Sequence, residues 1–220
     1  MNKEYYSVGV SWDKKLLRNR PVPQEVKILT KEFDEYMREY NSDTFMHIKN
    51  LHWLYDRIPS GLEGKLRYKD STWDYMHAVY FRFGMIAAVS ERVKKVLEET
   101  DVSKDEYVLK PITIQGCEGP YYLMFISTIS DSELIYSHST FDGYGVEGIV
   151  QFSSYEERIK VDDIGVRNIY LPDSYRSRDI IKLQSSPVVY FSKKLFDAFE
   201  MNKIKGYEFT HWTGLTLNFL

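Results

Sequence analysis

Hydrophobic and polar residues alternate at the start of the chain. The apolar or aromatic residues at every second position are Tyr6, Val8, Val10 and Trp12. This period of two predicts a half-buried first strand. Beyond two prolines, apolar residues recur every three or four positions, and this spacing predicts a helix over about Gln24–Tyr40.

The stretch from Pro187 to Trp212 has the pattern of a strand, a capped helix, a turn and a second strand. Val188–Phe191 is a short β-branched and aromatic run. Ser192 stands where a helix N-cap belongs, and the apolar residues after it recur at helical spacing. Gly206 is suited to the positive φ that turns the chain into the last strand, Tyr207–Phe209.

A weaker copy of this pattern lies earlier in the chain, over Met85–Ile114. Ser90 is its predicted cap and corresponds to Ser192 of the later stretch. The copies differ after the helix, because Gly206 falls opposite Lys104 and the first unit must turn differently. Two matching units suggest an internal repeat, whereas a solenoid needs about three or more.

The remaining chain predicts shorter elements separated by loops. We expect a short strand over 44–48 and a short helix over 70–80. A turn at 115–120 leads into a strongly apolar strand over 121–128. Residues 130–148 are polar and contain glycine, so we expect a long exposed connection. Further expected elements are a strand at 149–152, a short helix capped by Ser154 and Glu157, and strands at 166–171 and 179–183.

These elements predict an α+β fold: a mixed sheet with two related strand–helix–strand units and an additional N-terminal helix. A chain of 220 residues is long enough for one large domain or two small ones. We expect a single domain over 1–220. A subdivision near Gly84, into an N-terminal part at 1–83 and a mixed α/β part at 84–220, is the alternative.

The two units also carry a family resemblance. The segments Val-Ser-Glu-Arg-Val-Lys-Lys-Val-Leu, Tyr-Val-Leu-Lys-Pro-Ile, Gly-Pro-Tyr-Tyr-Leu-Met-Phe-Ile and Val-Val-Tyr-Phe-Ser-Lys-Lys-Leu-Phe with Lys-Gly-Tyr-Glu-Phe resemble a family of bacterial immunity proteins encoded beside polymorphic toxins. The resemblance covers roughly residues 83–212, and the first eighty residues match much less clearly. It implies a non-catalytic protein that binds and neutralises a cognate toxin, without a cofactor.

The composition bears on whether the chain binds nucleic acid, spans a membrane or carries disulfides. The chain is 43% hydrophobic and 28% charged, as in soluble globular proteins, and its net charge is −3. A net charge of this size does not favour nucleic-acid binding, for which a basic stripe would be expected. No apolar run is long enough to span a membrane. Cys117 is the only cysteine, and no apolar signal core stands at the N-terminus, so we expect a cytoplasmic protein. A homo-oligomer remains compatible with the sequence.

The stretch Gly143–Gly148 matches the G-x-G-x-x-G pattern of dinucleotide-binding loops. That fingerprint requires a preceding strand, a helix opening at its end and an acidic residue about 20 positions onward. Here a strand-like run follows the glycines, and no acid stands convincingly at that distance. We therefore interpret the stretch as a glycine loop and expect no cofactor.

We predict instead that this polar connection contacts a protein partner. Aromatic and acidic side chains on an exposed loop are typical interface residues. The candidate partner-binding residues are Asp131, Glu133, Phe141, Asp142, Tyr144 and Glu147. If the toxin is basic, these acids would complement it.

The alternative function is a small hydrolase-like enzyme with an acid and histidine site. On the predicted helix, Asp70, Asp74 and His77 share one face through their spacing. Three such ligands are chemically able to hold a divalent metal, but no second ligand cluster is evident, so we predict no metal site. Cys117 lies in a turn without a recognisable base, and we interpret it as a structural thiol.

Overall fold

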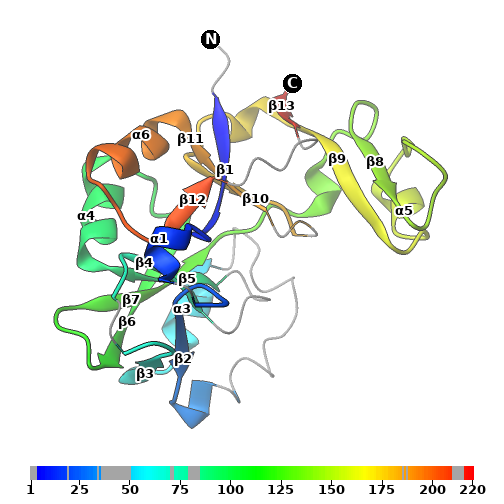
Figure 1. Cartoon of the computed structure of the whole chain (residues 1–220). Coiled ribbons are helices and arrows are strands. Elements are labelled where there is room, and N and C mark those ends of the chain that lie inside the picture. The colour runs from blue at the N-terminus through cyan, green and yellow to red at the C-terminus, as the bar shows by residue number, and fades with distance from the viewer. Residues whose placement is uncertain are drawn as a thin grey trace.

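The computed structural model (Figure 1) describes residues 4–18, 20–33, 35, 51–69, 72–78, 85–184, 186, 188–209 and 216–220. This part of the chain contains helices together with strands that pair in both parallel and antiparallel directions, as expected for the α+β class. None of the helices described there has the length and apolar character needed to cross a bilayer.

The first hydrophobic core fills a closed barrel. Its strands follow the order β2-β3-β6-β7-β5-β4. Their bounds are β2 (Glu25–Ile28), β3 (Leu62–Leu66), β4 (Tyr75–Ala78), β5 (Met85–Ser90), β6 (Tyr107–Gln115) and β7 (Tyr121–Ile126). Helix α3 (Leu51–Arg57) contacts β6. The barrel takes strands from both parts of the chain that a boundary near residue 84 would separate.

A four-stranded antiparallel sheet forms the second region. Its order is β10-β11-β1-β12, with bounds β1 (Tyr5–Val10), β10 (Ile180–Lys182), β11 (Val189–Ser192) and β12 (Tyr207–Phe209). Helices α4 (Glu91–Glu99) and α6 (Lys193–Met201) pack against each other (Figure 1). Apolar residues of both helices share one buried core with Val8, Val89 and Phe191, which joins this sheet to the barrel.

A third region projects from the body of the molecule (Figure 1). We call residues 129–171 the lobe. Its elements are η3 (Asp131–Glu133), β8 (Thr140–Gly143), α5 (Tyr155–Arg158) and β9 (Ile164–Leu171), and β13 (Thr216–Phe219) pairs in parallel with β9. A short helix, η4 (Asp173–Tyr175), follows β9. The hydrophobic core of the lobe includes Phe141, Phe152 and Ile169, and it continues into the four-stranded sheet through Ile181 and Tyr190.

Several sequence predictions are confirmed. The alternating residues after Glu4 form β1, and both strand–helix–strand stretches form their predicted elements in order. Ser192 caps α6, because its hydroxyl accepts a hydrogen bond from the Leu195 backbone N–H at 3.3 Å. Ser90 also occupies the N-cap position of α4, but its hydroxyl makes no bond to that helix.

One predicted helix is wrong in its first part, and a second predicted helix is wrong. Within the expected helix at 24–40, residues 25–28 form β2, because Val26 and Ile28 point into the barrel while Lys27 points outward. Helical backbone is described only from residue 31 onward in that stretch. The short helix expected at 70–80 is also wrong, since Tyr75–Ala78 form β4 between β2 and β5. The strand expected at 44–48 lies outside the described residues.

The barrel and the four-stranded sheet contain units of the same layout. Strands β4-β5-β7-β6 are neighbours in the barrel, and β10-β11-β1-β12 have the corresponding order in the sheet. In each unit the helix connects the second strand to the fourth, as β5 to β6 and as β11 to β12. The place of β7 in the first unit is taken in the second by β1, from the opposite end of the chain.

Candidate partner-binding sites

The exposed end of the lobe is a tightly held glycine loop. We call residues 143–149 the tip. A Cβ atom on Gly143 would lie 2.2 Å from the Asp163 carbonyl oxygen, and one on Gly145 would lie 2.0 Å from that of Asp162. Only glycine permits such a close approach of two backbone segments. These glycines therefore allow the tip to lie close to the chain behind it. No helix begins at residue 148 to receive a dinucleotide.

The tip presents a fully solvated aromatic side chain. Tyr144 has a relative exposure of 102%, and Ile149 in the same loop is 56% exposed. Glu147 is also exposed. A loop packed closely against a neighbouring segment, with an exposed tyrosine and a carboxylate, is suited to bind a partner.

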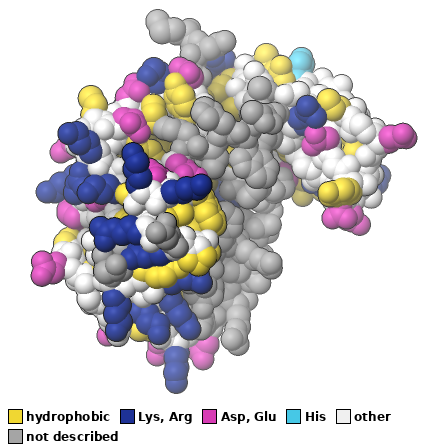
Figure 2. Space-filling view, viewed as in Figure 1, with side chains coloured by type: hydrophobic (Ala, Val, Ile, Leu, Met, Phe, Trp, Pro, Cys, Tyr) yellow, Lys and Arg dark blue, Asp and Glu magenta, His cyan; other side chains and the backbone are white. Residues whose placement is uncertain are grey.

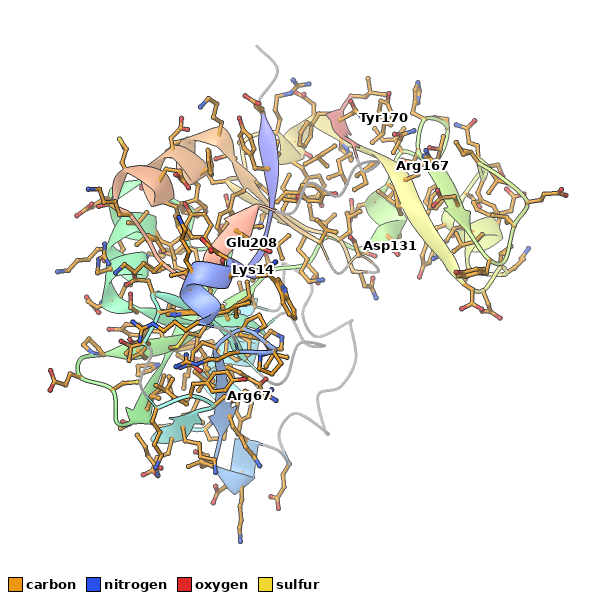
Figure 3. The ribbon with its side chains drawn as sticks, viewed as in Figure 1. Lys14, Arg67, Asp131, Arg167, Tyr170 and Glu208 are labelled. Carbon is orange, nitrogen blue, oxygen red and sulfur yellow. The ribbon has the colours of Figure 1, made fainter. Side chains whose placement is uncertain are left out.

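The structure separates the six residues predicted to bind a partner. Tyr144 and Glu147 lie at the tip, and Asp142 at its edge forms an ion pair with Arg167 at 2.9 Å. Glu133 is half-buried at the base of the lobe. Figure 3 labels Asp131 at that base and Arg167 on β9.

The predicted exposure is wrong for two of these residues, because their side chains are buried. Phe141 is completely buried and stacks on Tyr136, with ring centroids 5.6 Å apart. Asp131 is also buried, at the start of η3. The expected long exposed connection at 130–148 is thus a folded segment, because its apolar residues build the core of the lobe. The strand expected at 149–152 reduces to a single bridge between Val150 and Phe141.

Charge is unevenly distributed along the chain. Residues 140–165 contain six Asp or Glu and two Lys or Arg, a net charge of −4, whereas the whole chain carries −3. The end of the lobe is therefore an acidic surface.

The predicted capping box at the start of α5 is confirmed. Ser154 accepts a hydrogen bond from the Glu157 backbone N–H at 3.3 Å, and Glu157 accepts one from the Ser153 backbone N–H at 2.6 Å.

A pocket of about 370 Å³ lies where β1 meets the barrel. It has apolar walls from Val10, Trp12, Val22 and Pro23, together with Gly9. Trp12 is 55% exposed at this site, and its backbone N–H donates to a Glu208 carboxylate oxygen at 2.6 Å. The alternation of residues 6–12 predicts Trp12 only as part of a strand, although an exposed tryptophan is a frequent binding hot spot.

Polar groups line the same pocket from the barrel side. Glu25 of β2 and His77 of β4 are partners in a parallel strand pair, and Arg67 donates to the Glu25 carboxylate at 3.0 Å. Burial lowers the pKa of the His77 imidazole below its ordinary value, and the Glu25 carboxylate opposes that shift. The neutral imidazole can both donate and accept a hydrogen bond. Apolar walls with a few convergent polar groups are typical of a binding pocket.

The surroundings of the pocket are basic. Residues 13–31 and 62–69 contain nine Lys or Arg and three Asp or Glu. Figure 2 shows apolar side chains bordered by Lys and Arg in the region of α1 (Lys14–Leu17). Figure 3 places Lys14, Arg67 and Glu208 on this side of the molecule, away from the lobe. The pocket and the tip are thus separate surfaces of opposite charge.

The predicted acid and histidine site does not form as expected. Asp74 and His77 share no helix face, because β4 replaces that helix. Asp74 instead accepts hydrogen bonds from the Ser90 hydroxyl at 2.8 Å, Arg92 at 2.8 Å and the Lys205 backbone N–H at 3.0 Å. Asp74 therefore has a structural role in joining the two units. The described residues contain no cluster of three or more potential metal ligands, and Asp70 lies outside them.

Cys117 is a half-buried free thiol beside the barrel core. Burial raises the pKa of this thiol, which disfavours the nucleophilic thiolate near neutral pH.

No protein-family model matches the chain, and no curated protein matches it.

Proposed function

We propose that this chain is an immunity protein that binds a cognate bacterial toxin in the cytoplasm of the producing cell and neutralises it without catalysis. The resemblance over residues 83–212 suggests this class. The observation that carries the proposal is the tip, where Tyr144 is 102% exposed and Glu147 lies beside it on an acidic lobe. Blocking a toxin needs a complementary surface with a few anchor residues and no cofactor.

The shape and charge of the lobe support a contact with a basic toxin. The tip stands away from the body of the molecule (Figure 1), so it can enter a concave active site. An excess of carboxylates would accelerate encounter with a basic surface, and a pre-ordered aromatic anchor would slow dissociation. Both effects favour inhibition by occupying the toxin's substrate-binding face.

We also infer that the two units are copies of one repeated strand–helix–strand design. Asp74 and Asp179 have matching environments, since each accepts a hydrogen bond from the helix-cap serine of its own unit. The backbone N–H groups of Ser90 and Ser192 donate to the carbonyl oxygens of the same two aspartates, at 2.9 and 2.8 Å. Equivalent contacts at equivalent positions support duplication of one unit.

A co-expression experiment tests the toxin proposal. The tagged protein is co-expressed with the product of the adjacent gene, and complex formation and rescue of toxicity are measured. We expect a stoichiometric complex, and at least a tenfold loss of affinity in the double variant Tyr144→Ser, Glu147→Lys.

A matched control changes one acid and one exposed apolar residue elsewhere. Glu99→Lys with Met201→Ser alters exposed residues of α4 and α6 and should leave toxin binding unchanged. Equal affinity of the tip variant and the unmodified protein would exclude the tip from the interface. Absence of any complex, with a well-folded protein, would instead favour the enzyme alternative.

A further inference from the structure

We propose that the pocket at Trp12 binds the tip of a second copy of this chain, with Tyr144 as the inserted side chain. The contact joins two different surfaces, so each copy offers one tip and one pocket. This proposal does not depend on the identity of a toxin. It rests on the opposite charges of the two surfaces and on the matching chemistry of their apolar and polar parts.

The chemistry of tyrosine matches the lining of the pocket. A tyrosine ring would contact the apolar walls formed by Val10, Trp12 and Pro23, and an aromatic pair gains more than its buried area alone. Its hydroxyl would reach the polar side, where the carboxylate of Glu25 and the imidazole of His77 can accept a hydrogen bond. A pocket of about 370 Å³ is large enough for one aromatic side chain.

The charges around the two surfaces are complementary. The lobe segment at 140–165 carries a net charge of −4, and the segments at 13–31 and 62–69 carry six more basic than acidic residues. Glu147 follows Tyr144 by three residues, so it would meet the basic rim when the tyrosine is inserted. Arg67, whose side chain is 48% exposed, belongs to that rim.

The exposed surface of the tip gives a further reason for a partner. Tyr144 and Ile149 both expose apolar area at the tip, and association would remove that area from water. Because the tip and the pocket are different patches, the contact is heterologous and can extend into rings or chains. It would also compete with any toxin that binds the tip.

Sedimentation velocity of the full chain over a wide concentration range tests the proposal. We expect concentration-dependent association that weakens at high salt, because exposed charges are screened. Trp12→Ala removes the pocket wall, and Tyr144→Ser removes the inserted ring. Each variant should raise the dissociation constant at least tenfold, while Met201→Ser, at an exposed site on α6, should not change it.

A mixing experiment separates this arrangement from other kinds of self-association. The Trp12→Ala variant keeps its tip and the Tyr144→Ser variant keeps its pocket, so the two can form only one contact. We expect each variant alone to be monomeric and an equimolar mixture to form dimers that do not grow. Circular dichroism and melting temperature confirm that each variant is folded.

Three results would overturn the proposal: a wild-type protein that is monomeric at every concentration, variants that associate as the wild type does, or a mixture that stays monomeric. Toxin capture by Tyr144 could persist in each of these cases, so the toxin proposal and this one fail independently. The Tyr144→Phe variant tests the hydroxyl, and it should bind more weakly than wild type but more tightly than Tyr144→Ser.

Discussion

The two strand–helix–strand units have the same layout in different surroundings. The first, β4-β5-β7-β6, is closed into a barrel by β2 and β3. The second, β10-β11-β1-β12, is an open sheet whose third position is filled by the start of the chain. Local contacts around each helix cap are alike, whereas the tertiary partners of the strands differ. The same local design is therefore compatible with two kinds of sheet.

The two units differ in the side chains that surround each helix cap. Asp74 pairs with Arg92 at 2.8 Å, and Asp179 pairs with Lys194 at 3.3 Å, two residues beyond each cap serine. On the next turn, Lys94 lies 5.2 Å from the ring centroid of Tyr122. At the equivalent position of α6, Phe196 packs on Tyr6 with ring centroids 4.7 Å apart. A cation in the first unit thus corresponds to an aromatic ring in the second.

The sharpest difference lies just before the last strand of each unit. Backbone N–H groups of Ser127 and Ser11 donate to the carbonyl oxygens of Glu106 and Gly206, which identifies these two positions as equivalent. Each position contacts the start of the first strand of the other unit. Glu106 does so through its carboxylate, whereas Gly206 has no side chain and does so through its backbone. The predictions below are arranged around this difference.

The largest expected effect is that of Glu106→Ala. The buried Glu106 carboxylate accepts hydrogen bonds from the backbone N–H groups of Asp179 at 2.8 Å and Ile180 at 2.6 Å. It also attracts the buried Arg178 guanidinium. Alanine leaves that charge and both donors uncompensated, so urea denaturation should show a loss of about 3–5 kcal/mol in the free energy of unfolding.

Glu106→Gln is the matched control, because its amide oxygen can still accept both backbone bonds. The loss in the free energy of unfolding should be clearly smaller for Glu106→Gln than for Glu106→Ala. Equal losses in the two variants would mean that charge, rather than the hydrogen bonds, dominates at this position.

The next effect is that of Gly206→Ala. Gly206 has φ +100°, and a Cβ atom there would lie 2.1 Å from the Tyr75 carbonyl oxygen at the start of β4. The chain must shift to relieve this clash, and we expect about 3 kcal/mol of destabilisation in urea denaturation.

Gly116→Ala provides the comparison for Gly206. Gly116 also has a positive φ, +77°, but nothing lies within 4 Å of its Cβ position. The Gly116→Ala substitution should lower the free energy of unfolding only through backbone strain, by about 1–2 kcal/mol. A similar cost at both glycines would show that the close approach to Tyr75 is readily relieved.

A smaller effect concerns pH. His77 of β4 corresponds to Lys182 of β10, since both stand two residues after the first residue of the equivalent strand. The folded-state pKa of His77 is lowered from 6.5 by burial, so the unfolded chain binds the proton more readily. Its contribution to stability is therefore present above about pH 6.5 and is lost as pH falls through the lowered folded value.

Denaturation curves at stepped pH values measure this contribution. Stability of the wild type should fall on acidification below pH 6.5, and His77→Gln should reduce the slope. Lys182→Gln should leave the slope as it is, because lysine does not titrate in that range. An unchanged slope in His77→Gln would assign the pH dependence to other groups.

The smallest effect comes from the helix ends. α4 and α6 are followed by equivalent residues in the left-handed region, Asp101 at φ 54° and Lys203 at φ 50°. Glycine adopts this conformation without steric cost, but it also adds conformational entropy to the unfolded chain. The net effect of each substitution to glycine should be a rise of about 0.5 kcal/mol in the free energy of unfolding.

Thermal unfolding of the two glycine variants and their combination completes the comparison. Similar and additive gains are expected, since the two sites belong to different units. A gain in only one unit would mean that the other helix end is held by tertiary contacts.

Elements with a complete local signal could be predicted from the sequence. Ser192 has a hydroxyl suited to a cap and is followed by apolar residues at helical spacing, and α6 begins where this pattern places it. The alternation from Tyr6 to Val10 likewise predicts β1. Such signals depend on neighbouring residues alone, and both regions of the molecule retain them.

The errors arose where local spacing fits two structures. Val26 has helical spacing to Leu29 and extended spacing to Ile28, and pairing of β2 with β3 and β4 selects the strand. Phe141 stands in a polar stretch, but the core of the lobe buries it completely. The pocket was not predictable, because its walls come from residues far apart in the chain.

By itself, the sequence determined the helix caps, the alternation of β1, the α+β class and the uneven charge along the chain, since these depend on composition and near neighbours. Only the tertiary structure decided that β1 completes the second unit, that Asp74 joins the two units, and that Trp12 meets Glu25, Arg67 and His77 in one pocket. Those outcomes depend on which distant strands pair, and the free energy of pairing comes from cores that exist only in the folded chain.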